Sequence, residues 1–305
     1  MKIEVESTLG QRARNILSMK GKGIVIAVFS NSFYCRLDTN DLLLFHQSDY
    51  GVVPFGLGFK DLESIITMVK PTPGMDLTFY NFNVLFPEHA INIIPIRGSE
   101  LDERVPEIIF SEEIFTENLS IAENILLNRK GGIVERIIKL LENPRKGTEI
   151  KRPLNQNISS LWEVETFKKL RQGMDKESIT SIGIILDKII GLGTGLTPTM
   201  DDVLLGFAYI ISFLERNGTR VIPSSRTFLK MLKDKAGGLT TEISSAYLRS
   251  AALGEEYFLL EKVSRSLLSI EKNNELQRNI DALLNVGSDS GGNMLVGMLM
   301  GLCFR

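Results

Sequence analysis

The first third of the chain alternates short apolar runs with polar residues. β-Branched and aromatic side chains dominate the runs, and Asn, Asp, Ser and Thr separate them, which is the pattern of β-strands bounded by turns. The predicted strands are residues 23–29, 33–37, 41–45, 77–86 and 91–96. They follow one another without an evident helix between them, so the sequence favours an antiparallel sheet or a small barrel.

Beyond Ser111 the apolar positions recur with the period of a helix. The predicted helices are residues 116–127, 179–189, 226–235, 240–253, 256–270 and 276–284. Residues 203–214 are apolar almost all round, which predicts a central helix, and they are too few to span a bilayer of ~30 Å. The fold class is therefore α+β. We expect a β-rich N-terminal domain at 1–112 and a mostly helical domain at 113–305.

Between two of these helices, residues 143–153 are polar, charged and proline-bearing. This composition predicts a linker or a surface loop. Its basic side chains could reach an anion, but a solvated loop is the simpler interpretation.

Composition and charge exclude several classes of protein. Apolar residues make up 43% and charged residues 24%, which excludes general disorder. The net charge of −2 and the absence of a basic block argue against a nucleic-acid partner. Only two cysteines occur, Cys35 and Cys303, which suits reduced thiols, and we expect the charged N-terminus not to act as a signal peptide. We expect a cytoplasmic protein without a membrane partner. His46 and His89 lie in no recognisable catalytic or metal-binding motif.

The most informative segment is a glycine-rich turn, Gly191-Leu-Gly-Thr-Gly-Leu-Thr-Pro-Thr-Met-Asp-Asp202. We expect its first glycine to end a helix, Thr197 to be the N-cap of the next helix and Pro198 to be its first residue. Asp201 and Asp202 would then lie in the first helical turn. Free N–H groups converge at such a start, which makes it a ready anion site. The alternative is that the turn only joins two buried helices and the acids act as caps.

A second turn repeats this pattern. The segment 285–293 again joins two apolar helices, and Asp202-Val-Leu-Leu-Gly206 corresponds to Asn293-Met-Leu-Val-Gly297. Gly206, Gly297 and Gly301 would let the two helices approach closely, so both turns are predicted to line one pocket. By this alignment Asp202 faces the pocket, while Asp201 faces solvent or a metal.

A third group of hydroxyls could join the two turns. Thr240, Thr241, Ser244 and Ser245 fall at helical spacing, although capping and small-residue packing also account for them.

The candidate catalytic residues are Asp201 and Asp202. The candidate substrate-binding residues contribute hydroxyls, an amide side chain or glycine backbone at the two turns and on the helix that begins near residue 240. They are Gly193, Thr194, Gly195, Thr197, Thr199, Thr241, Ser244, Ser288, Ser290, Gly291 and Asn293. No metal ligand set or cofactor motif is present, although the adjacent carboxylates could hold Mg²⁺.

The string Gly193-x-Gly-Leu-Thr-Pro-Thr-x-Asp-Asp-x-Leu-x-Gly206 resembles the Gly-Leu-Thr-Pro-Ser-Gly-Asp-Asp motif of the AllH-type family. That family is named for a subunit of a bacterial oxamate carbamoyltransferase of allantoin breakdown. The likeness extends to residues 241–254 and 287–293 and is expected to cover most of the chain. This chain departs from the family at Thr199-Met200, where Ser-Gly is usual, and at Asn293, where Asp is common.

The resemblance implies carbamoyl transfer between phosphate and oxamate, by a subunit that works with other chains. Asp201 or Asp202 could then orient the attacking amide nitrogen or accept its proton. Neither turn contains Lys or Arg, and Lys188 is the nearest cation in sequence, so a partner subunit could supply positive charge. Two alternatives stay open: a magnesium-dependent enzyme that handles phosphoryl groups, and a non-catalytic module that binds a small carboxylate or ureido compound.

Overall fold

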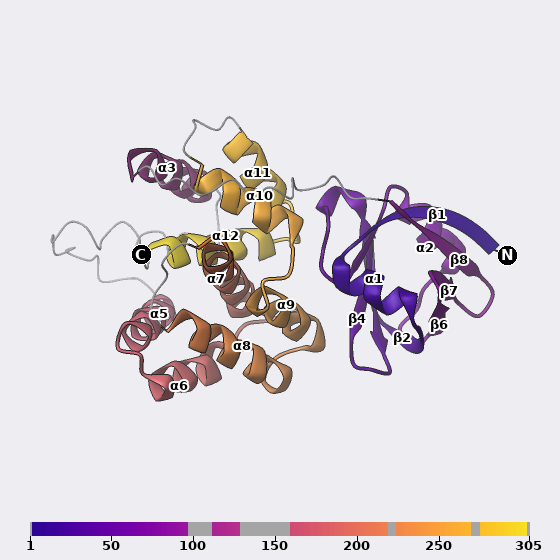
Figure 1. Ribbon diagram of the computed structural model, residues 1–305, viewed down its shortest axis with the longest axis horizontal. Coiled ribbons are helices and arrows are strands. Elements are labelled where there is room, and N and C mark those ends of the chain that lie inside the picture. Colours follow the sequence, from indigo (N-terminus) through magenta and orange to yellow (C-terminus); the bar gives the residue numbers. More distant parts are fainter. Residues whose placement is uncertain (1, 97–111, 129–158, 219–223, 270–274, 304–305) are drawn as a thin grey trace. The chain divides into compact units, whose positions relative to one another are not determined.

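The computed structural model describes residues 2–96, 112–128, 159–218, 224–269 and 275–303 (Figure 1). The chain divides into two compact units. One comprises Met1–Arg104 with Glu255–Leu259, and the other comprises Val105–Gly254 with Leu260–Arg305. The loop predicted at 143–153 lies outside the described residues, and the domain boundary predicted after residue 112 stays a prediction.

The first unit is a closed β-barrel. Its strands are β1 (Lys2–Leu9), β2 (Lys20–Phe29), β3 (Ser32–Leu37), β4 (Leu42–Gln47), β5 (Gly56–Phe59), β6 (Asp76–Tyr80), β7 (Asn83–Leu85) and β8 (Ala90–Ile96). They pair in the order β1-β5-β4-β3-β2-β6-β7-β8, and β8 returns to β1. The pairs β1–β8 and β4–β5 are parallel, and the other pairs are antiparallel. The predicted α+β class with an N-terminal barrel is confirmed.

Two expectations for this unit were wrong. Helices do separate the strands: α1 (Gln11–Ser18) follows β1, and α2 (Leu62–Val69) follows β5. The predicted strand 77–86 is a hairpin, because Asn81 and Phe82 adopt φ values of 42° and 61° and turn the chain between β6 and β7. Both helices span eight residues, which leaves little room for a helical period to show.

The barrel interior is packed with aromatic and aliphatic side chains. The rings of Phe33 and Phe45 stack with centroids 4.3 Å apart, and Phe45 stacks on Phe59 at 5.8 Å. Cys35 lies in the same core as a free thiol, as predicted, and burial raises its pKa well above the usual range. The interior is therefore a core rather than a ligand cavity lined by polar groups.

His46 gives this unit a predictable response to acid. Its ring is buried, with Nδ1 2.9 Å from the carbonyl oxygen of Gln47, and burial lowers the pKa to about 4 from 6.5. Between pH 6.5 and 4 the unfolded chain binds a proton that the folded chain does not. The free energy of unfolding should therefore fall as the pH drops through this window, by up to about 1.4 kcal/mol per unit. Urea unfolding at several pH values should show a flatter dependence for His46→Gln than for the control His89→Gln; equal slopes would contradict this.

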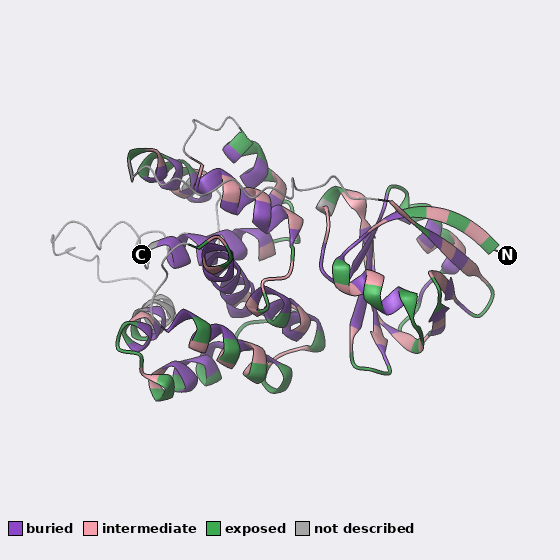
Figure 2. Cartoon of the chain, in the orientation of Figure 1, coloured by how far each residue is buried: buried purple, intermediate pink, exposed green. Residues whose placement is uncertain are grey.

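The second unit is helical. It contains α3 (Glu112–Asn128), α5 (Ser159–Asp175), α6 (Ile179–Ile189), α7 (Thr199–Arg216), α8 (Ser225–Leu239), α9 (Glu242–Ala252), most of α10 (Phe258–Leu267), α11 (Glu275–Leu284) and α12 (Ser290–Cys303). Helix α7 is buried on all sides from Met200 to Leu214, as predicted for the central helix (Figure 2). Among the described residues, no helix is both long and apolar enough to cross a membrane.

Glycines bring α7 and α12 into backbone contact. A Cβ atom on Gly206 would lie 1.8 Å from the carbonyl oxygen of Met294, and one on Gly297 would lie 1.9 Å from that of Val203. No side chain fits at such distances, so glycine is required at both positions. The close approach predicted from the sequence is confirmed.

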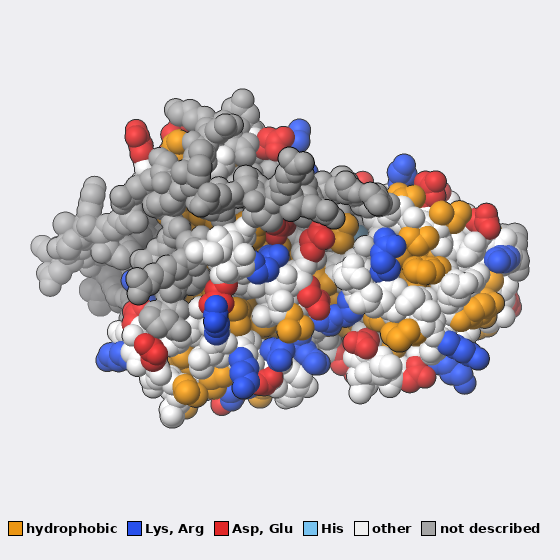
Figure 3. Space-filling model, in the orientation of Figure 1, with side chains coloured by type: hydrophobic (Ala, Val, Ile, Leu, Met, Phe, Trp, Pro, Cys, Tyr) orange, Lys and Arg blue, Asp and Glu red, His pale blue; other side chains and the backbone are white. Residues whose placement is uncertain are grey.

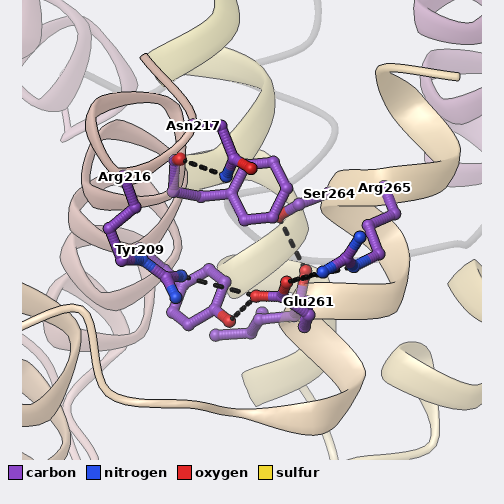
Figure 4. A network of polar contacts seen from close by, with 8 residues as sticks. Tyr209, Arg216, Asn217, Glu261, Ser264 and Arg265 are labelled. Carbon is purple, nitrogen blue, oxygen red and sulfur yellow. Dashed lines mark hydrogen bonds and ion pairs between the residues drawn. The ribbon is translucent and has the colours of Figure 1, made fainter. Parts of the chain in front are cut away.

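A buried acid ties α7 to α10. Glu261 accepts hydrogen bonds from the Tyr209 hydroxyl at 2.7 Å and from Arg265 Nε at 3.1 Å, and Arg216 Nη2 lies 3.4 Å away (Figure 4). Because its partners satisfy the buried carboxylate, this cluster serves packing. It fixes the half of α7 that is remote from the glycine-rich turn.

Candidate functional site

The glycine-rich turn depends on left-handed backbone. Gly191, Gly193 and Gly195 have φ values of 77°, 125° and 92°, which other residues rarely adopt. A Cβ atom on Gly191 would also lie 2.2 Å from the carbonyl oxygen of Leu239, and one on Gly193 would lie 2.5 Å from the amide nitrogen of Thr199. The turn is therefore pressed against the end of α8 and the start of α7. Gly191 follows the end of α6, as predicted.

The start of α7 differs from the prediction by one residue. Pro198, with φ −53° and ψ 143°, is the N-cap, and Thr199 is the first helical residue. The carbonyl of Pro198 accepts from the amides of Asp201 at 2.9 Å and Asp202 at 3.2 Å. Thr197 does not cap the helix, because its hydroxyl lies 3.3 Å from that of Ser290 instead.

Asp201 is buried and connects the glycine-rich turn to α9 through hydrogen bonds. Only 1% of it is exposed, so the expectation that it faces solvent was wrong. It accepts from the amide of Gly191 at 2.7 Å, from the Ser244 hydroxyl at 2.6 Å and from the Thr240 hydroxyl. Burial raises its pKa, while these three hydrogen bonds act in the opposite direction. Its oxygens are thus engaged within the protein.

Removing one hydrogen-bond donor to Asp201 should lower the stability of the protein. Ser244→Ala leaves a buried carboxylate with one hydrogen bond fewer, and bonds to charged groups contribute about 1.5–3 kcal/mol. We expect chemical denaturation to show a loss of this size. Ser250→Ala is the matched control, because the Ser250 hydroxyl is buried on the same helix and has no hydrogen-bond partner among the described residues. Equal losses of unfolding free energy in the two variants would contradict a stabilising role for the Ser244–Asp201 hydrogen bond.

Thr241 joins α9 to the turn in a second way. It is the N-cap of α9, where its hydroxyl accepts from the amide of Ser244 at 3.1 Å and donates to the carbonyl of Leu196. The capping interpretation of the hydroxyl group is correct for Thr241, and the same hydroxyl also holds the glycine-rich turn. Thr240, which donates to Asp201, was not among the predicted site residues, although it belongs to the group of hydroxyls at helical spacing noted in the sequence.

Asp202 lies where the two turns meet. It is 3% exposed, and its carboxylate takes part in hydrogen bonds with the side chains of Ser290, Thr197 and Asn293. Burial raises its pKa to about 7, and the charge of Asp201 acts in the same direction. A carboxyl group with this pKa can exchange a proton near neutral pH, as a general acid or base must.

The second turn is built like the first. Gly287 has a φ of 61°, and α12 begins at Ser290. Gly291 is packed so tightly that a Cβ atom would lie 1.9 Å from the carbonyl oxygen of Leu283. Asn293 is 4% exposed and faces Asp202. The two turns therefore meet as predicted, although a shared pocket stays a prediction.

The predicted binding residues fall into two groups. Hydroxyl and amide side chains of Thr197, Ser244, Ser290 and Asn293 surround the two acids, and Thr241 bonds the glycine-rich turn at the carbonyl of Leu196. The others are exposed, half-buried or purely structural: Gly193, Thr194, Gly195 and Ser288 lie at the surface, Thr199 is half-buried, and Gly291 serves packing.

The comparison with protein families bears on this segment. A family model matches residues 189–302. It is that of the oxamate carbamoyltransferase subunit AllH. The resemblance inferred from the sequence is confirmed for this part of the chain. No curated protein and no solved structure matches. The AllH match begins at the end of α6 and includes both turns, while the barrel lies outside it.

The AllH name describes a subunit of a carbamoyltransferase, which implies that further subunits complete the enzyme. Within the described residues, no group of three or more acidic, histidine or cysteine side chains could hold a metal ion. On the face seen in Figure 3, blue basic and red acidic side chains are interspersed.

Proposed function

We propose that this chain is a subunit of a carbamoyltransferase and that Asp202 is its acid–base residue. The substrates would be carbamoyl phosphate and a small amide-bearing carboxylate of the oxamate type, in purine nitrogen catabolism and in the cytoplasm. The observation that carries the proposal is a buried carboxyl group, with a pKa of about 7, inside the AllH match.

The reaction needs a proton acceptor. As the amide nitrogen of oxamate attacks the carbonyl carbon of carbamoyl phosphate, a C–N bond forms and the nitrogen must lose a proton. Asp202 would take this proton while the bond between that carbon and the phosphate oxygen breaks and phosphate leaves. In the reverse direction the protonated Asp202 would return it. A pKa near 7 suits both directions at neutral pH.

The anionic groups would bind at the glycine-rich turn. Gly193, Thr194 and Gly195 are exposed, and within the described chain their amide N–H groups donate no hydrogen bond. These donors suit a phosphate or a carboxylate. The binding surface would be completed by Thr197, Thr199, Thr241, Ser288 and Ser290. Ser244 and Gly291 would support it from within, the first by bonding Asp201 and the second by packing the start of α12. Neither turn carries Lys or Arg, so we propose that another subunit supplies the cation.

The test is turnover in the reconstituted enzyme. The chain and its candidate partner subunits would be mixed with carbamoyl phosphate and oxamate, and oxalurate would be followed by chromatography with phosphate release in parallel. We expect product only when this chain is present, and we expect Asp202→Asn to abolish it. Product that forms equally well without this chain, or with Asp202→Asn, would exclude the proposal.

The magnesium-dependent alternative is less well supported. Both oxygens of Asp201 accept hydrogen bonds from protein donors, and the buried Asp202 is hydrogen-bonded to three side chains. A cation would therefore have to displace protein donors at either carboxylate. Calorimetry with Mg²⁺, with and without phosphate, separates the two enzymes. A non-catalytic module would instead bind oxamate without turnover in any mixture of subunits.

A further inference from the structure

Apolar side chains are exposed around the glycine-rich turn. Leu192 and Leu196 lie in the turn and are 38% and 44% exposed, and Leu239, the last residue of α8, is 38% exposed. A single exposed leucine needs no explanation, whereas several exposed leucines that lie together mark an interaction surface.

Two contacts bring these three leucines together. The backbone of Gly191, next to Leu192, is pressed against the carbonyl oxygen of Leu239, which a Cβ atom on the glycine would approach to 2.2 Å. The carbonyl of Leu196 accepts a hydrogen bond from Thr241, two residues beyond Leu239. Both ends of the turn are thus fixed to residues 239–241, and the leucines gather on one part of the surface.

The end of α8 beside these leucines carries no side chains. Gly237 and Gly238 are exposed helical residues, and a Cβ atom at either would meet nothing within 4 Å. Neither glycine has a positive φ, so the backbone conformation does not require glycine there. Each one weakens the helix relative to alanine without a packing reason in the described chain. Bare backbone at this place suits the close approach of another molecule.

The molecule that covers this surface should also bring positive charge. Both substrates of the proposed reaction are anions, and neither turn contains Lys or Arg. Lys235, on α8, is already paired with Asp187. A second copy of this chain would present the same acids and the same turns without cations. A different chain that carries a cation is therefore the better occupant.

We propose that Leu192, Leu196, Leu239 and the two glycines at the end of α8 form the docking surface for another subunit of the carbamoyltransferase. That subunit presents apolar side chains to the leucines and an arginine to the anion held by the turn. Arginine suits this role because its planar set of donors pairs with phosphate and carboxylate oxygens. The AllH name, which describes one subunit of an enzyme, is an independent reason to expect a partner. The inference rests on the proposed function, since it assigns the cation of that site to the interface.

Biolayer interferometry with each candidate partner subunit, purified on its own, tests the surface. Leu192→Ala/Leu239→Ala should weaken the wild-type Kd by at least about tenfold, because each leucine buries apolar area that alanine lacks. The matched control is Leu253→Ala. Leu253 is 53% exposed but lies at the opposite end of α9 from Thr241, so its replacement should leave the Kd unchanged.

A glycine variant separates assembly from folding. Gln favours a helix more than Gly does, so Gly238→Gln should not lower the melting temperature of the isolated chain. Its long side chain should nevertheless obstruct the partner and weaken binding by about tenfold or more.

Inorganic phosphate is the probe for the arginine. If phosphate bridges the turn and the partner, the two subunits should bind each other more tightly in phosphate than in chloride of equal ionic strength. An unchanged Kd would overturn the assignment of a cationic partner.

Wild-type affinity in both surface variants, or no binding of any candidate subunit to the wild-type chain, would overturn the inference. Self-association that the same substitutions abolish would also overturn it, because the surface would then join two copies of this chain; sedimentation velocity of the chain alone detects this. Loss of binding in the variants without carbamoyl transfer by the wild type would remove the proposed function only. Transfer by a complex that every variant forms equally well would remove only this inference.

Discussion

Asp202→Asn should be more stable than the wild-type protein at pH 8 and yet almost inactive. The folded pKa of Asp202, about 7, lies above the ordinary value of 3.8. Between these values the folded chain binds more protons than the unfolded chain, so the free energy of unfolding falls as the pH rises, and the loss is complete above pH 7. Asn carries no charge and avoids this loss, which is roughly 4 kcal/mol at most.

The activity of Asp202→Asn should fall, although its stability rises. Loss of a general base lowers turnover by about 10²–10⁴-fold, so kcat of the reconstituted enzyme should fall by that factor. In the wild type, kcat should depend on a group with a pKa near 7, and the variant should lose this dependence. Melting curves from pH 4 to 8 and pH–rate profiles are the measurements.

Asp201→Asn is the matched control for Asp202→Asn. Burial raises the pKa of Asp201 as well, while its three hydrogen bonds act in the opposite direction, so this change should raise the melting temperature at pH 8 less than Asp202→Asn does. If both substitutions destabilise the protein equally and turnover survives both, the two acids act only as helix caps.

Gly206→Ala should have the largest effect on folding. The new methyl group would lie 1.8 Å from a backbone oxygen of α12, and a backbone cannot turn aside as a side chain can. Overpacking typically costs about 1–3 kcal/mol, and we expect about 3 kcal/mol or more here, because both helices are buried along this contact. Urea unfolding followed by circular dichroism measures this loss.

The control for Gly206→Ala lies in α8. Gly237 is helical and exposed, and a Cβ atom there would meet nothing within 4 Å. Gly237→Ala should therefore stabilise the protein by up to about 1 kcal/mol. If Gly206→Ala unfolds at the same urea concentration as the wild type, the close contact of α7 and α12 is not present in solution.

Much of this architecture could be predicted from sequence patterns. The spacing of apolar residues predicted the observed bounds of α6, and the all-round apolar character of residues 203–214 predicted the central helix. What the patterns missed is short or half-buried. In β1, charged residues alternate with small and apolar ones, and β5 is only four residues long with two glycines. Such strands form because the barrel closes around them, and that is a tertiary effect.

The candidate site was likewise predicted only in part. Gly191 and the two acids marked the right place, because a left-handed turn needs glycine and the start of a buried helix needs polar partners. The orientation of Asp201 could not be predicted, because its partners Thr240 and Ser244 come from a segment about forty positions further along the chain. Similarly, Thr197 has the sequence context of an N-cap, and only the fold places Ser290 beside it.

The position of β1 in the barrel has a consequence for synthesis on the ribosome. This strand is made first, but its neighbours are β5 and β8, which follow it by roughly fifty and ninety residues. Meanwhile β2, β3 and β4 can already pair as successive hairpins. The nascent chain thus carries β1 unpaired until β5 is made, and the other edge of β1 stays open until β8 follows. Contacts between such distant segments form slowly. Closure of this unit should be the slow step in its folding, and the half-made barrel, with its open edges, is the form most exposed to aggregation.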